Sequence, residues 1–202
     1  MLDHVPSLHR PPVTRVSSTI RRQPLPERWT ERLLLPDGRQ LLLRPIVPED
    51  AEPLRHGFSL LHPEEVRMRF MYTMKELTPE MARRLTELDP RTDFALVVAE
   101  PLPPGEALVA AVVRASVDRD RRRAEFAILV SHFVAGQGLG RLLMRRIVRW
   151  ARLKRLDTLY GDILEDNQPM LMLAEAMGFS REHRTEDPGI VRVELALKSG
   201  TA

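Results

Sequence analysis

The clearest hydrophobic pattern in the chain lies between residues 124 and 156, where the spacing of the apolar side chains changes halfway. Residues 124–130 are a short apolar run rich in strand-forming residues. A segment with Gly136, Gly138 and Gly140 follows. Beyond it, apolar residues recur three or four positions apart, as in an amphipathic helix: Leu139, Leu142, Leu143, Ile147, Trp150, Ala151 and Leu153. The pattern predicts a strand, a glycine-rich turn and a helix.

The rest of the chain alternates between strand-like and helix-like segments. Apolar runs predict strands at about 33–46 (with a turn at 36–38), 94–98, 107–117, 158–164 and 190–197. Helix starts are expected at Pro48, Pro63 and Pro79, where proline and acidic residues share the first turn, and after Asn167. The order strand, three helices, three strands, helix, strand, helix, strand favours an α+β domain. Its central sheet is expected to be mixed and mostly antiparallel, with helices on both faces.

The first 31 residues differ from the rest of the chain. Prolines and arginines recur there without hydrophobic periodicity. We therefore expect a flexible Pro/Arg-rich arm at 1–31 and a single domain at 32–202. The alternative is a basic arm that covers a neighbouring chain or docks a partner.

Composition narrows the class of protein. Of the 202 residues, 43% are hydrophobic and 29% charged, a balance that suits one globular domain. The chain has no cysteine, which excludes disulfides and a thiolate nucleophile, and its six histidines show no metal-ligand spacing, so no metal is expected. No apolar run approaches the roughly 18 residues of a membrane span, and a cytoplasmic protein is expected. A net charge of +3 permits an anionic ligand without indicating nucleic acid.

The glycine-rich turn is a candidate phosphate site. A helix that begins after glycines presents unpaired N–H groups and the positive end of its dipole to an anion. A Walker loop is excluded because no Lys-Ser/Thr pair follows, and a dinucleotide fingerprint would need glycine where Arg141 or Leu143 stands. Residues 135–140 instead resemble the acyl-CoA loop of the GNAT N-acetyltransferase superfamily, Q/R-x-x-G-x-G/A, with Ala135 at the first position.

This resemblance extends over about residues 33–198 and implies the GNAT fold with acetyl-CoA as cosubstrate. It implies a sheet splayed beside residues 128–130, where the pantetheine arm would pair with free backbone groups. Asn167 would lie near the far side of the splay, or would only cap a helix. The expected coenzyme-binding residues are Ile128, Leu129, Val130, Gly136, Gln137, Gly138, Leu139, Gly140, Arg141 and Asn167.

Several further blocks resemble the catalytic domain of bacterial Pat-type protein lysine acetyltransferases. They are residues 43–50, 69–70, 75–77, 84–89, 124–127, 167–171, 178–179 and 187–189. The resemblance implies a protein substrate bearing an acceptor lysine, such as an acyl-CoA synthetase, and no nucleic-acid or membrane partner. A small-amine or N-terminal acetyltransferase and a non-catalytic acyl-CoA sensor remain alternatives.

Glu125 is the candidate catalytic residue. A lysine amine has a pKa near 10.4, so deprotonating it at pH 7 costs about 4.6 kcal/mol, part of which a general base recovers. Strand alternation places Glu125 on one face with Ala127 and Leu129, where desolvation would raise the pKa of its carboxyl group. The alternative is a salt bridge to an arginine of residues 119–123. No general acid is assigned, because Ala174 occupies the position of the tyrosine found in many GNAT enzymes.

Overall fold

A computed structural model describes residues 19–183 and 187–197. In this part of the chain, nine strands form one sheet in the order β1-β2-β3-β4-β5-β6-β7-β9-β8, and every neighbouring pair is antiparallel except β6 and β7. The strands are β1 Arg21–Pro24, β2 Glu31–Leu34, β3 Gln40–Pro45, β4 Asp93–Ala99, β5 Val109–Val117, β6 Arg123–Val130, β7 Thr158–Leu164, β8 Ser180–His183 and β9 Ile190–Ala196.

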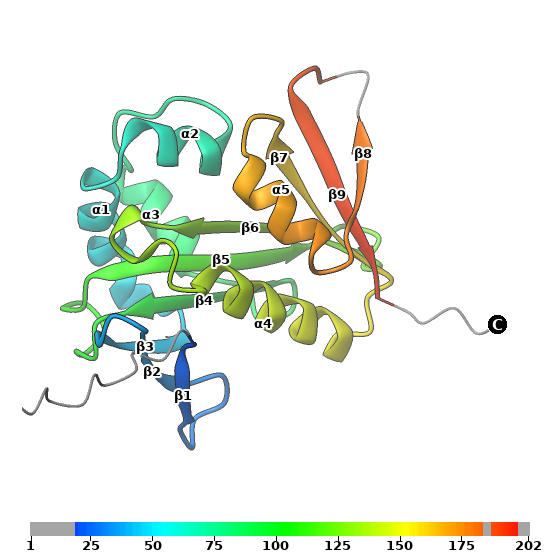
Figure 1. Ribbon diagram of the computed structural model, residues 1–202. Helices are drawn as coiled ribbons and strands as arrows, with labels where there is room; N and C mark the ends of the chain where they lie inside the picture. The colour runs from blue at the N-terminus through cyan, green and yellow to red at the C-terminus, as the bar shows by residue number, and fades with distance from the viewer. Residues whose placement is uncertain (1–18, 184–186, 198–202) are drawn as a thin grey trace, which may run out of the picture.

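The helices cover the sheet on two faces (Figure 1). One face carries α1 (Ala51–Ser59), which follows the 3₁₀ turn η1 (Pro48–Asp50), together with α2 (Pro63–Phe70) and α3 (Pro79–Thr86). The other face carries α4 (Leu139–Leu153) and α5 (Gln168–Glu175), with the short 3₁₀ turn η2 (His132–Val134) before α4. The mixed α+β sheet with helices on both faces is the fold that the sequence predicts.

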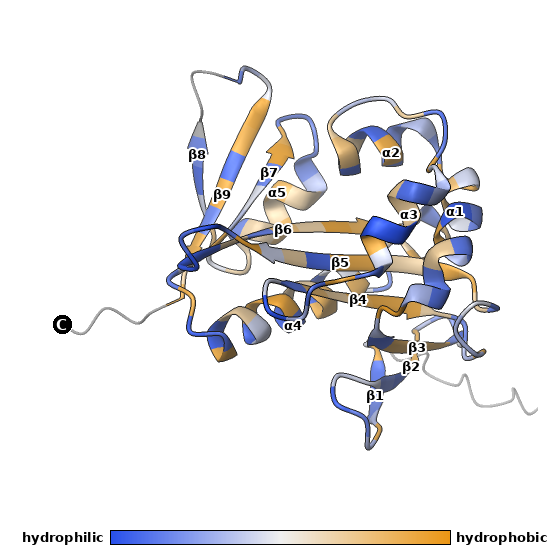
Figure 2. Cartoon of the chain, turned by 180° about the vertical axis from the view of Figure 1, so that it is seen from behind, coloured by the Kyte–Doolittle hydropathy of each residue, from blue (hydrophilic) through white to orange (hydrophobic). Residues whose placement is uncertain are grey.

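The hydrophobic pattern of α4 explains why it packs where it does. Leu143, Met144 and Ile147 are completely buried in the largest hydrophobic cluster, against the sheet. The central strands are mostly hydrophobic, as Figure 2 shows. Leu153, at the end of the predicted apolar stripe, is exposed instead. None of the described helices combines the length and the apolar character that a membrane span requires.

Two strands were not expected from the sequence. The strand β1 lies inside the predicted arm, and its four residues are all exposed, so no alternation of apolar and polar residues marks it. The strand β8 is equally polar in sequence and pairs only with β9. Residues 1–18 of the predicted arm lie outside the described residues. The expected strand at 33–46 is the hairpin β2–β3 around the predicted turn.

The pairing of β6 with β7 ends early, and this opens the sheet. Only three parallel pairs form, the last between Glu125 and Tyr160. One residue further along, the ring of Phe126 lies over Gly161, where an added Cβ would stand 2.7 Å from two ring carbons. The ring also packs edge-to-face against Phe179, with 5.4 Å between centroids. Side-chain packing thus replaces the next backbone pair, and no strand of the described chain pairs with the β7 side of residues 126–130.

We expect Gly161→Ala to destabilise the fold because its methyl group would collide with the ring of Phe126. Overpacking of this kind costs about 1–3 kcal/mol, or a fall in melting temperature of about 2–4 °C for each kcal/mol. Thermal melts of Gly161→Ala, Phe126→Leu and the double variant would test this. A coupling of at least about 0.5 kcal/mol, with the smaller leucine relieving the collision, is expected. Additive effects would contradict it.

Candidate active site

The turn between η2 and α4 offers a row of free backbone donors. Gly136 and Gly138 have φ angles of 74° and 86°, a left-handed conformation that glycine adopts without steric cost. None of the backbone N–H groups of residues 136–141 donates a hydrogen bond to another described residue. They lie at the N-terminal end of α4, where the helix dipole favours negative charge. The turn can therefore hold an anionic group, as the sequence predicts.

A cavity of about 340 Å³, here called the turn cavity, runs from this turn along the open edge of β6. Its opposite wall comes from Glu64, Glu65, Met68 and Arg69 of α2. The candidate binding residues that line it are Ile128, Leu129, Val130, Gly136, Gly138, Leu139, Gly140 and Asn167. The open strand edge and the free turn amides thus belong to one continuous site.

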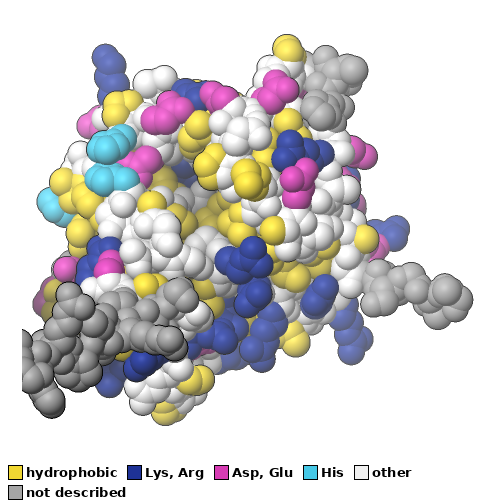
Figure 3. Space-filling view, in the orientation of Figure 1, with side chains coloured by type: hydrophobic (Ala, Val, Ile, Leu, Met, Phe, Trp, Pro, Cys, Tyr) yellow, Lys and Arg dark blue, Asp and Glu magenta, His cyan; other side chains and the backbone are white. Residues whose placement is uncertain are grey.

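The other two candidate binding residues lie apart from the lining of this cavity. The Oε1 atom of Gln137 is buried without a hydrogen-bond partner among the described residues. Arg141 instead borders a separate groove that contains Arg145, Arg149 and Arg152. Figure 3 shows a column of basic side chains on this face of the molecule. Gln137 and Arg141 can contribute their backbone N–H groups to the turn.

Asn167 has the capping role that was one of its two expected functions. Its Oδ1 atom accepts a hydrogen bond of 3.2 Å from the backbone N–H of Met170, in the first turn of α5. The residue also lines the turn cavity and the cavity next to it. The other expected role of Asn167, a contact with the coenzyme, stays a prediction.

A second cavity, of about 260 Å³, adjoins the first and contains Glu125; it is called the Glu125 cavity. The residues that line both cavities are Met68, Arg69, Ile128, Asn167 and Met170. Asp162 also lines the Glu125 cavity. An anion held at the turn and a group beside Glu125 would therefore meet near Ile128 and Arg69.

The carboxylate of Glu125 has no direct cationic partner. Burial raises the pKa of Glu125, and the Asp162 carboxylate raises it further, although Arg192 opposes these effects. No arginine of the described chain lies within 4.0 Å of it. Arg122 and Arg123 pair with Asp157 and Glu194 instead. The expected alternative, a salt bridge from Glu125 to an arginine of residues 119–123, is wrong, because none of these arginines forms an ion pair with it.

Tyr160 lies opposite Glu125 on β7, but its hydroxyl group is bound within the protein. Its hydroxyl group donates a hydrogen bond of 3.0 Å to Oδ1 of Asp118. The guanidinium groups of Arg123 and Arg192 each lie 4.6 Å from its ring centroid. Burial and the Asp118 contact raise the pKa of Tyr160 to about 12, so it releases its proton reluctantly.

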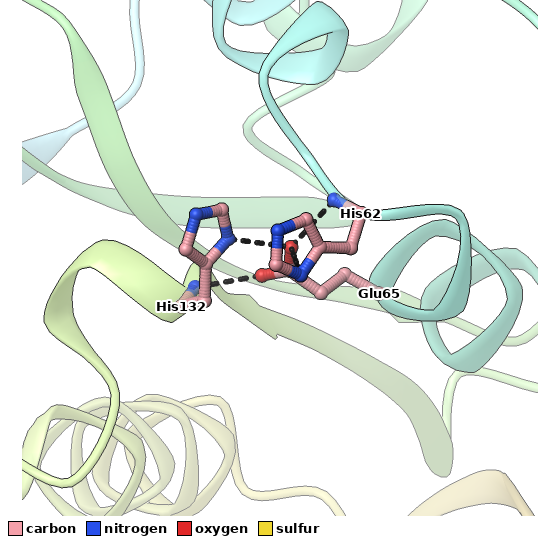
Figure 4. Close-up of side chains that lie close together, drawn as sticks. All are labelled: His62, Glu65 and His132. Atoms are coloured by element: carbon pink, nitrogen blue, oxygen red, sulfur yellow. Dashed lines mark hydrogen bonds and ion pairs between the residues drawn. The ribbon is translucent and has the colours of Figure 1, made fainter.

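Hydrogen bonds to Glu65 fasten α2 beside the turn (Figure 4). Glu65 accepts bonds of 2.7 Å from the backbone N–H groups of His62 and His132. Its Oε2 atom lies 2.8 Å from Nδ1 of His132, and the two histidine rings stack 4.0 Å apart. Burial raises the pKa of Glu65, but these bonds lower it overall. Candidate metal-ligating atoms of the three residues lie within 4.8 Å of one another, a grouping that their sequence spacing does not reveal.

A second contact fastens α2 on the other side of the opening. The guanidinium group of Arg67 lies 2.5 Å from the carboxylate of Asp166, in the loop between β7 and α5. The two residues are 99 positions apart in the chain. No local sequence pattern connects them, and sequence analysis alone missed both α2 contacts.

A sheet opened at one strand pair, beside a glycine turn that starts a helix, is the architecture of acyl-CoA-dependent transferases. The family described as "Acetyltransferase (GNAT) domain" matches residues 40–180. The chain belongs to this family and is an acetyl-CoA-dependent acetyltransferase. The free turn amides and the open edge of β6 fit the diphosphate and the amide-bearing arm of such a coenzyme.

Comparisons with individual proteins agree with this assignment. The chain is 29% identical to Acetyltransferase PA5475 of Pseudomonas aeruginosa over 171 residues, which cover 85% of this chain and 90% of that protein. The structure resembles the GNAT domain of S. lividans PAT, with a TM-score of 0.73 and 25% identity, covering 86% of this chain and all of that one. It also resembles a GNAT-family acetyltransferase from Streptococcus pneumoniae, with a TM-score of 0.60, 20% identity, and coverage of 78% and 99%.

We expect Gly138→Ala to weaken acetyl-CoA binding. A side chain at its left-handed φ angle costs about 1–2 kcal/mol, and the turn would relax away from the conformation that presents its amides. A loss of 1 kcal/mol corresponds to about a fivefold rise in KM for acetyl-CoA. Steady-state kinetics would measure this rise.

Gly38→Ala is the matched control for this prediction. Gly38 has a φ angle of 90° and open space around it, in the β2–β3 turn. The control should lose similar stability without a change in KM. Equal KM values for Gly138→Ala and the native protein would contradict a binding role for the turn.

Proposed function

We propose that this protein acetylates lysine side chains of proteins, such as acyl-CoA synthetases, with Glu125 as the general base. The observation that carries the proposal is the unpaired carboxylate of Glu125, with its raised pKa, beside the open edge of β6. The similarity to the S. lividans PAT domain and the sequence blocks typical of Pat-type enzymes support a protein lysine as acceptor.

The arrangement suggests how each substrate is held. The amides of residues 136–141 would bind the diphosphate of acetyl-CoA, and the free backbone groups of residues 128–130 would pair with the pantetheine amides. The acceptor amine would enter through the Glu125 cavity, which Asp162 also lines while paired with Arg192. The Glu125 carboxylate would favour a cationic side chain such as lysine over a neutral acceptor.

The chemical step needs a neutral amine and a stabilised oxyanion. Glu125 would take a proton from the amine directly or through a water molecule. The amine nitrogen then forms a bond to the thioester carbonyl carbon, and a backbone N–H near Val130 would stabilise the oxyanion. As the carbonyl re-forms, the C–S bond breaks and CoA leaves as a thiolate. A thiol has a pKa near 8.5, so this departure does not depend on a strong acid.

One observation favours a second candidate, a non-catalytic acyl-CoA sensor. Ala174, which stands at the position of the expected acid, is completely buried, and Tyr160 is bound to Asp118. A sensor would bind acetyl-CoA without releasing thiol. Measuring thiol release from acetyl-CoA, with and without a synthetase as acceptor, separates the two. Mass-spectrometric mapping of acetylated lysines would then identify the acceptor class.

We expect Glu125→Gln to lower kcat/KM by about 10²–10⁴-fold, the usual contribution of a general base. In the native protein, kcat/KM should rise with pH as Glu125 ionises, over a range above that of an ordinary glutamate because its pKa is raised. The variant should lose this dependence. The measurement is a pH series of thiol release at limiting acceptor concentration.

Stability provides the control for this variant. Because folding raises the pKa of Glu125, its ionised form destabilises the folded state once the pH exceeds the unfolded pKa. Glu125→Gln should therefore melt no lower than the native protein at pH 7. Glu80→Gln, on the exposed face of α3, should keep full activity. Full turnover by Glu125→Gln would show that another group is the base.

A further inference from the structure

Arg69 is a charged side chain at the centre of the site, without an ion-pair partner among the described residues. It lines the turn cavity, the Glu125 cavity and a third cavity beneath α1 and α3. It makes no hydrogen bond or ion pair with another described residue; its nearest aromatic contact is the Phe70 ring, 4.8 Å from the guanidinium carbon. Burial lowers the pKa of Arg69 to about 10, and the charge of Arg114 acts in the same direction. The Glu125 carboxylate opposes these effects but forms no ion pair with Arg69, so no anion of the described residues binds the guanidinium group directly.

Arg114 supplies a second guanidinium group from the middle of the sheet. In the register of β4, β5 and β6 it stands between Ala95 and Ala127, whose small side chains leave it uncovered on both sides. It also lines the third cavity, here called the Arg114 cavity. Its ion pair with Asp93 is long, at 3.5 Å, because Asp93 also accepts a bond of 2.5 Å from the hydroxyl of Ser116.

Asp93 pairs with Arg114 at 3.5 Å, and the Glu125 carboxylate attracts Arg69 without forming an ion pair with it. The two guanidinium groups are like charges that line the same largely apolar cavity. Such a pair is unfavourable unless an anion lies between the groups. A carboxylate suits the position best, because the planar guanidinium group binds its two oxygens with parallel hydrogen bonds. Apart from the two arginines, the residues lining the Arg114 cavity are apolar.

We infer that Arg69 and Arg114 form a binding subsite for a carboxylate carried by one of the substrates. The inference rests on the proposed function, because it names a substrate property of the same site. The carboxylate can belong to the acyl group or to the acceptor. A carboxylate from either substrate would bind the same two guanidinium groups.

The geometry favours the acyl group as the source. The Arg114 cavity shares Arg69 with both other cavities, and it also shares Phe70 with the Glu125 cavity. It shares Leu129, on the strand edge proposed to hold the coenzyme arm, with the turn cavity, whereas the proposed base, Glu125, does not line it. An acyl chain and an acceptor amine would therefore occupy different cavities. The Arg114 cavity has a volume of about 60 Å³, which holds about four to six water-sized groups at about 10–15 Å³ each.

This space fits a short dicarboxylic acyl group. Beyond the thioester carbonyl, a malonyl or succinyl group adds a few heavy atoms that end in a carboxylate. Transfer would proceed as for acetyl: the amine nitrogen bonds to the thioester carbon, the proton goes to Glu125, and CoA leaves as a thiolate. The distal carboxylate would remain unchanged throughout.

Succinyl-CoA and butyryl-CoA provide the matched test, because they have the same chain length and differ in the terminal carboxylate. The full chain should bind succinyl-CoA at least about tenfold more tightly by calorimetry, and kcat/KM should follow. Arg69→Gln should remove the difference. Arg84→Gln, an exposed arginine of α3, is the control and should keep it. Arg114→Gln tests the same ratio if Arg69→Gln does not fold.

A second pair of compounds tests the acceptor as the source. An α-amino acid and its amide differ only in the carboxylate, and either variant should equalise their kcat/KM if the acceptor supplies it. Ratios that are the same in the native protein and both variants, for both pairs, would overturn the subsite. Absence of acetyl-CoA turnover would contradict the proposed function separately, because the calorimetric ratio does not depend on turnover.

Discussion

The early end of the β6–β7 pairing is the constraint on which the site depends. A full-length parallel pair would satisfy the backbone of residues 126–130 and fill the turn cavity. Instead, Phe126 packs over Gly161 after only three pairs, and the strands separate. The exposed edge of β6 has backbone N–H and C=O groups without strand partners, and an amide-bearing ligand can form hydrogen bonds with them. Because Glu125 belongs to the last pair, the candidate base stands at the beginning of the opening.

Charged groups of both signs stand unpaired around this opening. Glu125 has a raised pKa and Arg69 a lowered one, so each environment favours the neutral form. A direct ion pair between them would remove both shifts and would also mask both groups from a substrate. Because they form no ion pair, a carboxylate and a guanidinium group both line the Glu125 cavity without binding each other. Such uncompensated charges are typical of functional sites, where a bound ligand can supply the opposite charge.

The sequence predicts those parts of the structure that short-range patterns control. The amphipathic period gives α4, the glycines give the turn, and buried apolar runs give the central strands. The edge strands β1 and β8 carry no such pattern, since all residues of β1 are exposed and β8 has no apolar residue. The groups that lie near Arg69 and Glu65 in the fold could not be predicted from the sequence either. Arg114 is 45 residues from Arg69, and His132 is 67 from Glu65, so only the folded sheet brings them together.

The position of α2 follows from the same opening. The splay removes backbone bonds between the two halves of the sheet, and α2 replaces them with side-chain bonds. Glu65 connects it to the segment before the turn, and Arg67 connects it to Asp166 beyond β7. The Arg67–Asp166 pair is largely exposed, and exposed ion pairs contribute little stability. One wall of the turn cavity is thus held on its β7 side by an exposed ion pair, and Arg69 follows both contact residues in the last turn of the same helix.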